Sequence, residues 1–154
     1  MIEVNHEDTI LRTFILFVQS ANAALKYADA TFFRRAKLSV IKFIVLQVLA
    51  TNGGSMKPSE LAEWTSTERH NITTLVDRMA QDELGRAQRN ERDRRFVNIT
   101  PNDKGMKVLD QAKPVAREIV NQVMSSISEN DALLLEKLLK VLKQNAHSGS
   151  SIYR

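Results

Sequence analysis

The sequence of 154 residues contains no cysteine. Without a thiol, the chain cannot form a disulfide, a zinc–thiolate site, an iron–sulfur cluster or a thiol redox switch. The absence of cysteine suits a reducing cytoplasm, and the cytoplasm is the location that we predict from the sequence.

The sequence also lacks a long hydrophobic run. Residues 1–8 have neither the basic start nor the apolar core of a signal peptide. The apolar run at 14–18 is far shorter than the roughly 20 residues that cross a bilayer. We therefore expect a soluble chain with no membrane partner.

No catalytic or metal-binding pattern is present in the sequence. The three histidines, His6, His70 and His147, are scattered and lack metal-ligand spacing. Gly53 and Gly54 do not lie between a strand and a helix, so they do not form a phosphate-binding loop. The carboxylates fall on helical positions that face solvent. We expect no enzyme activity, no metal and no cofactor.

What the sequence does contain is an uneven distribution of charge. A hydrophobic content of 43% and a charged content of 26% are ordinary for a globular chain, which argues against disorder. The net charge of +4 permits an acidic partner without establishing one. Between residues 57 and 83, six carboxylates outnumber three cations. From 86 to 95 the balance reverses, with two carboxylates against five arginines: Arg86, Arg89, Arg92, Arg94 and Arg95.

The spacing of apolar residues predicts a mostly helical chain. A seam at intervals of three and four residues predicts a long helix over 10–33. An adjoining apolar row makes this stripe wide enough to bury two faces, although an ordinary monomer core is the alternative explanation. A second helix over 39–51 is expected to end at Asn52-Gly53-Gly54, and a third begins at Pro58. Trp64 is expected to pack inside the unit formed by this third helix and the next one.

A fourth amphipathic helix is predicted to run to Asp82, with Ser66 or Thr67 as its cap. One face is apolar and points inward: Ile72, Leu75, Val76 and Met79. The opposite face is polar and points outward: His70, Thr73, Thr74 and Asp77. Two strands are predicted at 84–89 and 95–100, with Val97 and Ile99 as an inward pair.

The last third of the chain is predicted to be helical again. Asn102 is expected to cap a helix that Pro114 bends or interrupts. Ser128 is expected to open a final leucine-rich helix. These patterns divide the chain into an N-terminal helix (1–36), a central helix–strand segment (37–102), two C-terminal helices (103–147) and a flexible tail (148–154).

Several short motifs within 61–105 share the order and spacing of one known family. They are Leu61-Ala62-Glu63, Ile72-Thr73-Thr74-Leu75-Val76-Asp77-Arg78-Met79, Asp93-Arg94-Arg95 and Asp103-Lys104-Gly105. In these motifs, and in the order of its helices, the chain resembles the MarR family of transcriptional regulators. It departs from the family at Glu83 and Gly85, where Gly and a β-branched residue are usual, and at Pro101-Asn102, which replaces Leu-Thr.

The resemblance implies a winged helix-turn-helix that binds double-stranded DNA, flanked by N- and C-terminal dimerisation helices. It assigns the major groove to five residues of the fourth helix: Arg69, His70, Asn71, Thr73 and Thr74. It assigns the minor groove to Arg94 or Arg95, and support of the wing to Asp93 through a nearby arginine. We expect Arg86, Arg89 and Arg92 to contact phosphates.

The same resemblance implies a homodimer on an inverted-repeat operator, acting as a repressor whose small-molecule effector binds between the dimerisation helices and the DNA-binding lobe. Three alternatives remain open on sequence alone. Part of the helix could contact only phosphates or water. The arginine-rich segment could be a solvated loop. The chain could also be a dimeric winged-helix adaptor without sequence-specific DNA binding.

Overall fold

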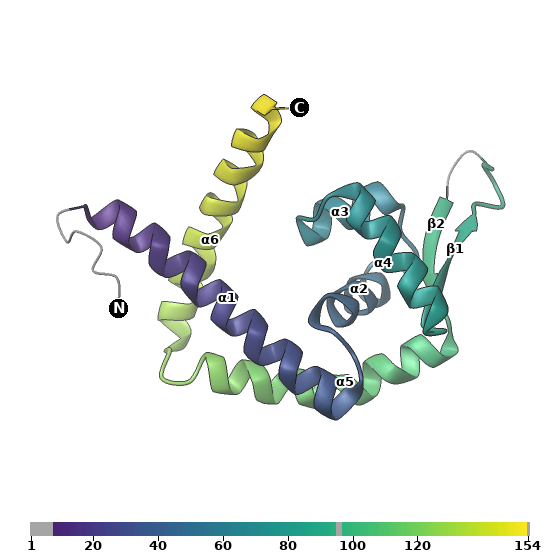
Figure 1. Ribbon diagram of the computed structural model, residues 1–154, viewed down its shortest axis with the longest axis horizontal. Helices are drawn as coiled ribbons and strands as arrows, with labels where there is room; N and C mark the ends of the chain where they lie inside the picture. Colours follow the sequence, from purple (N-terminus) through teal and green to yellow (C-terminus); the bar gives the residue numbers. More distant parts are fainter. Residues whose placement is uncertain (1–7, 95–96, 154) are drawn as a thin grey trace. The chain divides into compact units, whose positions relative to one another are not determined.

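The computed structural model describes residues 8–94 and 97–153. In chain order the elements are α1 (Thr9–Ala36), α2 (Val40–Thr51), α3 (Pro58–Thr65), α4 (Arg69–Gln81), β1 (Gly85–Arg89), β2 (Val97–Pro101), α5 (Asp103–Val123), α6 (Glu129–Ser150) and a 3-10 turn, η1 (Ser151–Tyr153) (Figure 1). The predicted fold class, mainly helical with a small antiparallel wing, is confirmed.

The chain forms two compact units, Met1–Val120 and Asn121–Arg154. The first unit holds α1 to β2 and most of α5, and the second holds the end of α5, then α6 and η1. The roles predicted for the segments, dimerisation for 1–36 and 103–147 and DNA binding for 37–102, remain predictions. None of the helices among the described residues is both long and apolar enough to cross a membrane.

The core of the first unit lies beneath the central helices and the sheet. Its largest fully buried side chains come from α2 to α5, from β2 and from the connection between α1 and α2: Leu38, Val45, Leu46, Leu49, Leu61, Ile72, Met79, Ile99 and Leu109. The long helix α1 contributes only its C-terminal third, because its buried residues are Ala28, Thr31 and Phe32. The N-terminal part of α1 therefore leaves its apolar seam exposed within the described chain.

Capping fixes the ends of α1 and α2. Asp8 accepts a hydrogen bond from the Leu11 amide at 3.0 Å and begins α1. Ser39 accepts from the Lys42 amide at 3.3 Å, and Asp29 of α1 accepts from the Val40 amide at 2.8 Å, so two side chains cap α2. The predicted end of α2 is confirmed, since both glycines after Asn52 have positive φ angles of 81° and 82°.

The turn between α3 and α4 differs from the prediction. Ser66 is the left-handed C-cap of α3, with φ 53°, and Glu68 is the N-cap of α4. The predicted cap at Ser66 or Thr67 is therefore wrong, because ending α3 uses both residues: the Ser66 and Thr67 amides donate to Glu63 and Ala62 carbonyls. Trp64 is 56% exposed on α3, so its predicted burial is also wrong.

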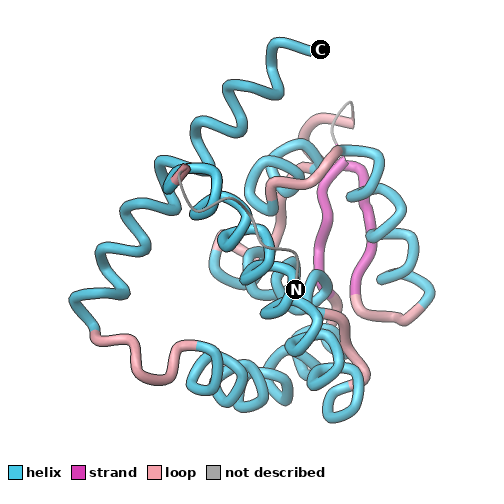
Figure 2. Tube along the Cα trace, turned by 60° about the vertical axis from the view of Figure 1, so that its left-hand side comes forward, coloured by secondary structure: helices cyan, strands magenta, loops and turns pink. Residues whose placement is uncertain are grey.

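Strands β1 and β2 form an antiparallel pair in register from Gly85–Pro101 to Arg89–Val97 (Figure 2). A third segment pairs at one point, where Met56 and Ile99 exchange backbone hydrogen bonds of 3.2 and 2.7 Å. Ile99 is buried as predicted, but Val97 is 36% exposed, so the inward pair is only half correct. Val97 lies at the wing end of β2, beyond the core.

Of the two C-terminal helices, α6 is longer than predicted, whereas α5 ends at Val123, before the predicted Ile127. Pro114 lies inside α5 without interrupting it, and Ala112, Val115 and Ile119 bury the same side of the helix around it. Ser128 caps α6 as predicted, accepting from the Asp131 amide at 3.1 Å. Residues 148–153 are helical or in a 3-10 turn, so the predicted tail at 148 starts too early. Three serine hydroxyls there donate to carbonyls four residues earlier: those of Ser148, Ser150 and Ser151.

Within the first unit, α1 and α5 are joined by an ion pair between Arg35 and Glu118. The hydrogen bond from the Arg35 guanidinium lowers the pKa of the Glu118 carboxyl. Both side chains are exposed to solvent, where an ion pair contributes little to the stability of the fold.

Candidate nucleic-acid interface

The polar face of α4 is exposed along its whole length. The four apolar residues predicted to point inward are buried and fix the rotation of the helix on the core. The five predicted contact residues are all exposed: Arg69, His70, Asn71, Thr73 and Thr74. A helix held by one buried face presents its opposite face at a fixed angle, which is what a groove-binding helix requires.

The hydroxyl groups on this face have defined partners. Thr73 Oγ1 donates to the Arg69 carbonyl at 3.3 Å, and Thr74 Oγ1 donates to the His70 carbonyl at 3.1 Å. Because the hydroxyl protons point into the helix, the lone pairs and methyl groups are what these threonines offer outward. A thymine methyl group in the major groove can be read by such a surface.

A cluster of exposed arginines lies on the wing. Arg86 and Arg89 project from β1, and Arg92 and Arg94 from the loop that follows it, all exposed. With its amide oxygen turned toward Arg86, Gln88 accepts from Nε at 3.2 Å and Nη2 at 3.0 Å. Arg95 lies outside the described residues. Four exposed guanidinium groups within nine residues form a concentrated positive charge beside a helix that has little net charge.

The turn at the tip of the wing is organised by Asn90, which the sequence reasoning missed. Its Oδ1 accepts from the Arg92 amide at 2.9 Å and from the Asp93 amide at 3.3 Å. This is the Asx-turn pattern, in which a short amide side chain bonds to backbone two and three residues ahead. Asn directly before the arginine-rich loop was the available signal. The support that Asp93 gives the wing remains a prediction.

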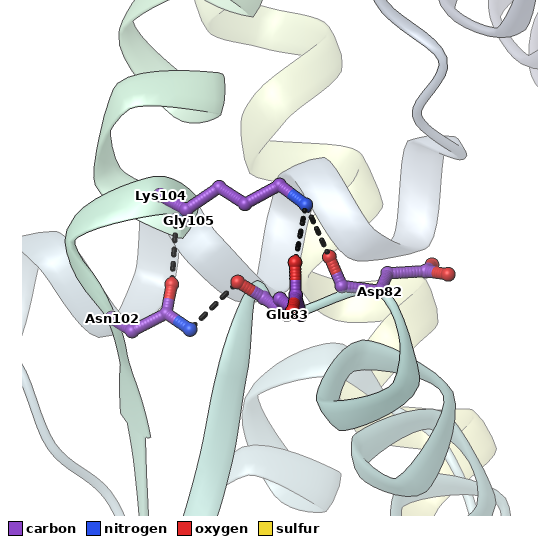
Figure 3. A network of polar contacts seen from close by, with 5 residues as sticks. All are labelled: Asp82, Glu83, Asn102, Lys104 and Gly105. Carbon is purple, nitrogen blue, oxygen red and sulfur yellow. Dashed lines mark hydrogen bonds and ion pairs between the residues drawn. The ribbon is translucent and has the colours of Figure 1, made fainter.

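A cluster of polar contacts joins the end of α4 to the start of α5 (Figure 3). We call Asp82, Glu83, Asn102, Lys104 and Gly105 the wing-base latch. Lys104 Nζ donates to the Asp82 carbonyl at 3.2 Å and to Glu83 Oε2 at 3.1 Å. Asn102 Nδ2 donates to the Glu83 carbonyl at 2.6 Å, and Asn102 Oδ1 accepts from the Gly105 amide at 2.8 Å.

Two glycines make the close backbone approaches around the latch. An ideal Cβ on Gly105 would lie 1.9 Å from the Leu84 carbonyl oxygen, and one on Gly85 would lie 2.9 Å from the Thr100 carbonyl oxygen. The approach at Gly85 gives a physical reason for glycine at the entrance of the wing, where the sequence departs from the usual β-branched residue. Glu83 has a φ of 59°, a left-handed conformation that favours glycine.

We expect Glu83→Gly to raise the free energy of unfolding by about 0.5–1 kcal/mol. The left-handed conformation costs a residue with a Cβ roughly 1–2 kcal/mol, part of which is offset by the exposed ion pair that Glu83 makes with Lys104. Urea unfolding followed by circular dichroism measures the change. Ala80→Gly, one residue before the end of α4, is the control and should lower stability by up to about 1 kcal/mol. A loss of stability in Glu83→Gly would show that the ion pair outweighs the backbone strain.

A sequence model described as MarR family matches residues 36–95, which contain α2 to β1 and the wing loop. Over this segment the chain is similar to the MarR family, in agreement with the resemblance of its sequence motifs. MarR-family proteins are DNA-binding regulators of transcription and not enzymes. In the described part of the chain, no group of three His, Asp or Glu side chains is placed to hold a metal.

Proteins similar to this chain include transcriptional repressors. NicR of Pseudomonas putida, an HTH-type transcriptional repressor, is 28% identical over 114 residues, covering 73% of this chain and 72% of NicR. The transcriptional regulator BldR from Sulfolobus solfataricus is 27% identical, with a TM-score of 0.78 over 92% of this chain and 99% of BldR. Sco3205 from Streptomyces coelicolor, solved in complex with DNA, is 18% identical and shares the fold, with a TM-score of 0.81 over 94% of this chain and 90% of Sco3205.

Proposed function

We propose that this protein is a sequence-specific regulator of transcription that binds double-stranded DNA as a homodimer and represses the genes beside an inverted-repeat operator. The observation that carries the proposal is the exposed polar face of α4 directly before a wing with exposed arginines. The names of NicR and Sco3205, as a repressor and as a protein solved with DNA, support the same function. A regulator of this kind acts where the chromosome is, which agrees with the predicted cytoplasmic location.

In this proposal the helix and the wing have different tasks. The side chains of Arg69, His70, Asn71, Thr73 and Thr74 enter the major groove, where the four base pairs present different hydrogen-bonding patterns. Arg94 or Arg95 enters the minor groove, whose negative potential is greatest where it is narrow. Arg86, Arg89 and Arg92 bind phosphates and, together with the minor-groove arginine, supply the salt-dependent part of the affinity.

Dimerisation is proposed from the apolar residues that each unit leaves exposed. In the first unit, α1 exposes Ile10, Leu11, Phe14, Val18 and Leu25 by between 39% and 79%. In the second, α6 buries none of its residues and exposes seven large apolar side chains: Leu133, Leu134, Leu135, Leu138, Leu139, Val141 and Leu142. Rows of exposed large apolar residues on a helix are typical of a protein interface. Two α4 helices related by a two-fold axis can meet major grooves about 34 Å apart.

We also propose that a small-molecule effector controls DNA binding, and this proposal rests on the resemblance to ligand-responsive regulators. A small molecule that prefers the dimer with its two α4 helices out of register with the DNA would release the operator. The extent of release is limited by the difference between its affinities for the two states. Binding titrations in the presence of candidate ligands test this part separately from DNA binding.

The deciding experiment selects bound sequences from a random duplex pool and then titrates the selected and scrambled duplexes across salt. We expect Arg94→Ala and Arg95→Ala each to weaken binding to both duplexes. Each variant should also make the slope of log affinity against log salt less steep by about 0.9, because one positive charge that neutralises the DNA is lost. Asn71→Ala and Thr74→Ala should leave the slope unchanged and reduce discrimination by about 1 kcal/mol each, roughly fivefold.

Lys113→Ala on α5 is the control, because it removes an exposed cation that lies outside α4, the wing and the exposed apolar residues of α1 and α6. If neither class of variant changes binding, or if the wild-type protein binds no duplex at modest salt, the sequence-specific regulator is excluded. The dimeric winged-helix adaptor would then be the better description.

A further inference from the structure

The C-terminal end of α4 is held by lysines from two other helices. Lys42 of α2 pairs with the Asp82 carboxylate at 2.5 Å, and Lys104 of α5 donates to the Asp82 carbonyl and to the Glu83 carboxylate. The last carbonyls of a helix carry the negative end of its dipole, so cations at this position are favourable. These contacts fix one end of the helix that carries all five proposed major-groove residues.

The same cluster also fixes the base of the wing. Glu83 and Leu84 connect α4 to β1, which begins at Gly85. Asn102, directly after β2, donates through its side chain to the Glu83 carbonyl and through its backbone amide to the Leu84 carbonyl, at 2.6 and 3.1 Å. The wing-base latch therefore determines the orientation of the wing relative to α4.

Lys104 is the member of the latch whose side chain spans from α5 to the α4–β1 connection (Figure 3). Its ammonium group is directed at two acceptors of the protein itself, a carbonyl and a carboxylate. The side chain is 55% exposed and that of Glu83 is 76% exposed, so removing the pair does not open the core. The position can be changed without unfolding the protein, which makes its role measurable.

We propose that Lys104 is a positioning residue that determines DNA specificity without contacting DNA. The inference rests on the proposed function. Specific binding requires α4 to sit in the major groove while the wing reaches the minor groove, so it depends on the angle between the two. Nonspecific binding depends on phosphate contacts, which exposed arginines make over a range of angles. Loosening the latch should weaken the first kind of binding and leave the second unchanged.

The experiment compares full-length wild type, Lys104→Gln and Lys104→Arg on the selected and scrambled duplexes across salt. We expect Lys104→Gln to weaken binding to the selected duplex about three- to fivefold, the range set by an exposed ion pair. Affinity for the scrambled duplex and both salt slopes should stay at wild-type values. Lys104→Arg should restore most of the specific affinity, because a guanidinium can donate to both acceptors.

Two further variants separate positioning from direct contact and from general charge. Lys107→Gln removes an exposed cation one turn further along α5 and should leave the affinity for both duplexes unchanged. Glu83→Gln weakens the partner of Lys104, keeps the length of the side chain, and should act in the same direction as Lys104→Gln. Thermal unfolding measured in parallel should show a midpoint for Lys104→Gln no more than about 4 °C below that of wild type, the shift expected from the loss of one exposed ion pair.

The possible results lead to different conclusions. Equal losses on both duplexes, with the salt slope reduced by about 0.9, would mean that Lys104 binds a phosphate, and would overturn the positioning role. An unchanged ratio between selected and scrambled duplexes in Lys104→Gln would also overturn it, while leaving the regulator intact. Failure of the wild-type protein to distinguish the two duplexes would overturn the proposed function itself.

Discussion

Replacing Gly105 with alanine is expected to lower the free energy of unfolding by at least about 3 kcal/mol. The added Cβ would lie 1.9 Å from the Leu84 carbonyl oxygen and 2.9 Å from the Leu84 carbonyl carbon. Both are backbone atoms, so no flexible side chain can move aside. Relief would require α5 to move away from the α4–β1 connection and would break the Asn102 contacts of the wing-base latch.

Helix propensity and packing predict opposite signs for this substitution. In the first turn of an exposed helix, alanine is favoured over glycine by up to about 1 kcal/mol. Gly105 is buried, and the overlap of more than 1 Å with the Leu84 carbonyl is larger than a few tenths of an ångström of relaxation can absorb. Packing therefore decides the sign at Gly105, and the loss is a large fraction of the 5–15 kcal/mol typical of a folded domain.

Urea unfolding followed by circular dichroism measures the effect, with Gly149→Ala as the matched control. An added Cβ at Gly149 meets no atom within 4 Å, so propensity alone acts there and alanine should be neutral or slightly stabilising. Equal midpoints for Gly105→Ala and wild type would mean that α5 moves at little cost. In that case the latch would not be a rigid connection.

The helices were predictable from the sequence because their signals are local. The apolar positions of α4 repeat at intervals of three and four, and all four proved to be buried. Asn102 and Ser128 cap their helices as expected, since a cap needs only an oxygen placed three residues before an amide. The glycines after Asn52 end α2 for an equally local reason, which is the positive φ that they tolerate.

Contacts between distant residues were not predictable. Met56 pairs with Ile99 across more than forty residues, and nothing in the short segment around Met56 indicates a strand. The exposure of Trp64 depends on how α3 sits on its neighbours, which a helical pattern does not contain. Glu83 was noted as unusual from its sequence, but its left-handed backbone and its pairing with Lys104 required the fold.

The residues of the candidate interface were predictable from the sequence, but the contacts that hold the interface in place were less so. Exposure of the five residues on α4 follows from the helical period once the apolar face is known. The concentration of arginine between 86 and 95 can be read directly from the sequence. The Asn90 turn and the wing-base latch could not be placed in the same way, because each depends on the path of the backbone through β1, β2 and α5.

The largest effect on DNA binding is expected from Phe14→Glu, a charge placed in the exposed apolar seam of α1. Phe14 is 58% exposed and lies in a row of exposed apolar residues on α1, which the proposed dimer would cover. A buried carboxylate without a partner would oppose association strongly. A monomer can occupy only one half-site, and loss of the second, linked binding event should weaken operator affinity about 100-fold or more.

Molar mass from light scattering and titration of the selected duplex measure the two effects together. Gln19→Glu is the control, because it adds the same charge to α1 on the side opposite the seam and should keep the wild-type molar mass and operator affinity. On a duplex that carries one half-site, Phe14→Glu and wild type should bind with the same affinity, since α4 and the wing are unchanged. A dimeric Phe14→Glu protein with full operator affinity would show that the seam of α1 is not the dimer interface.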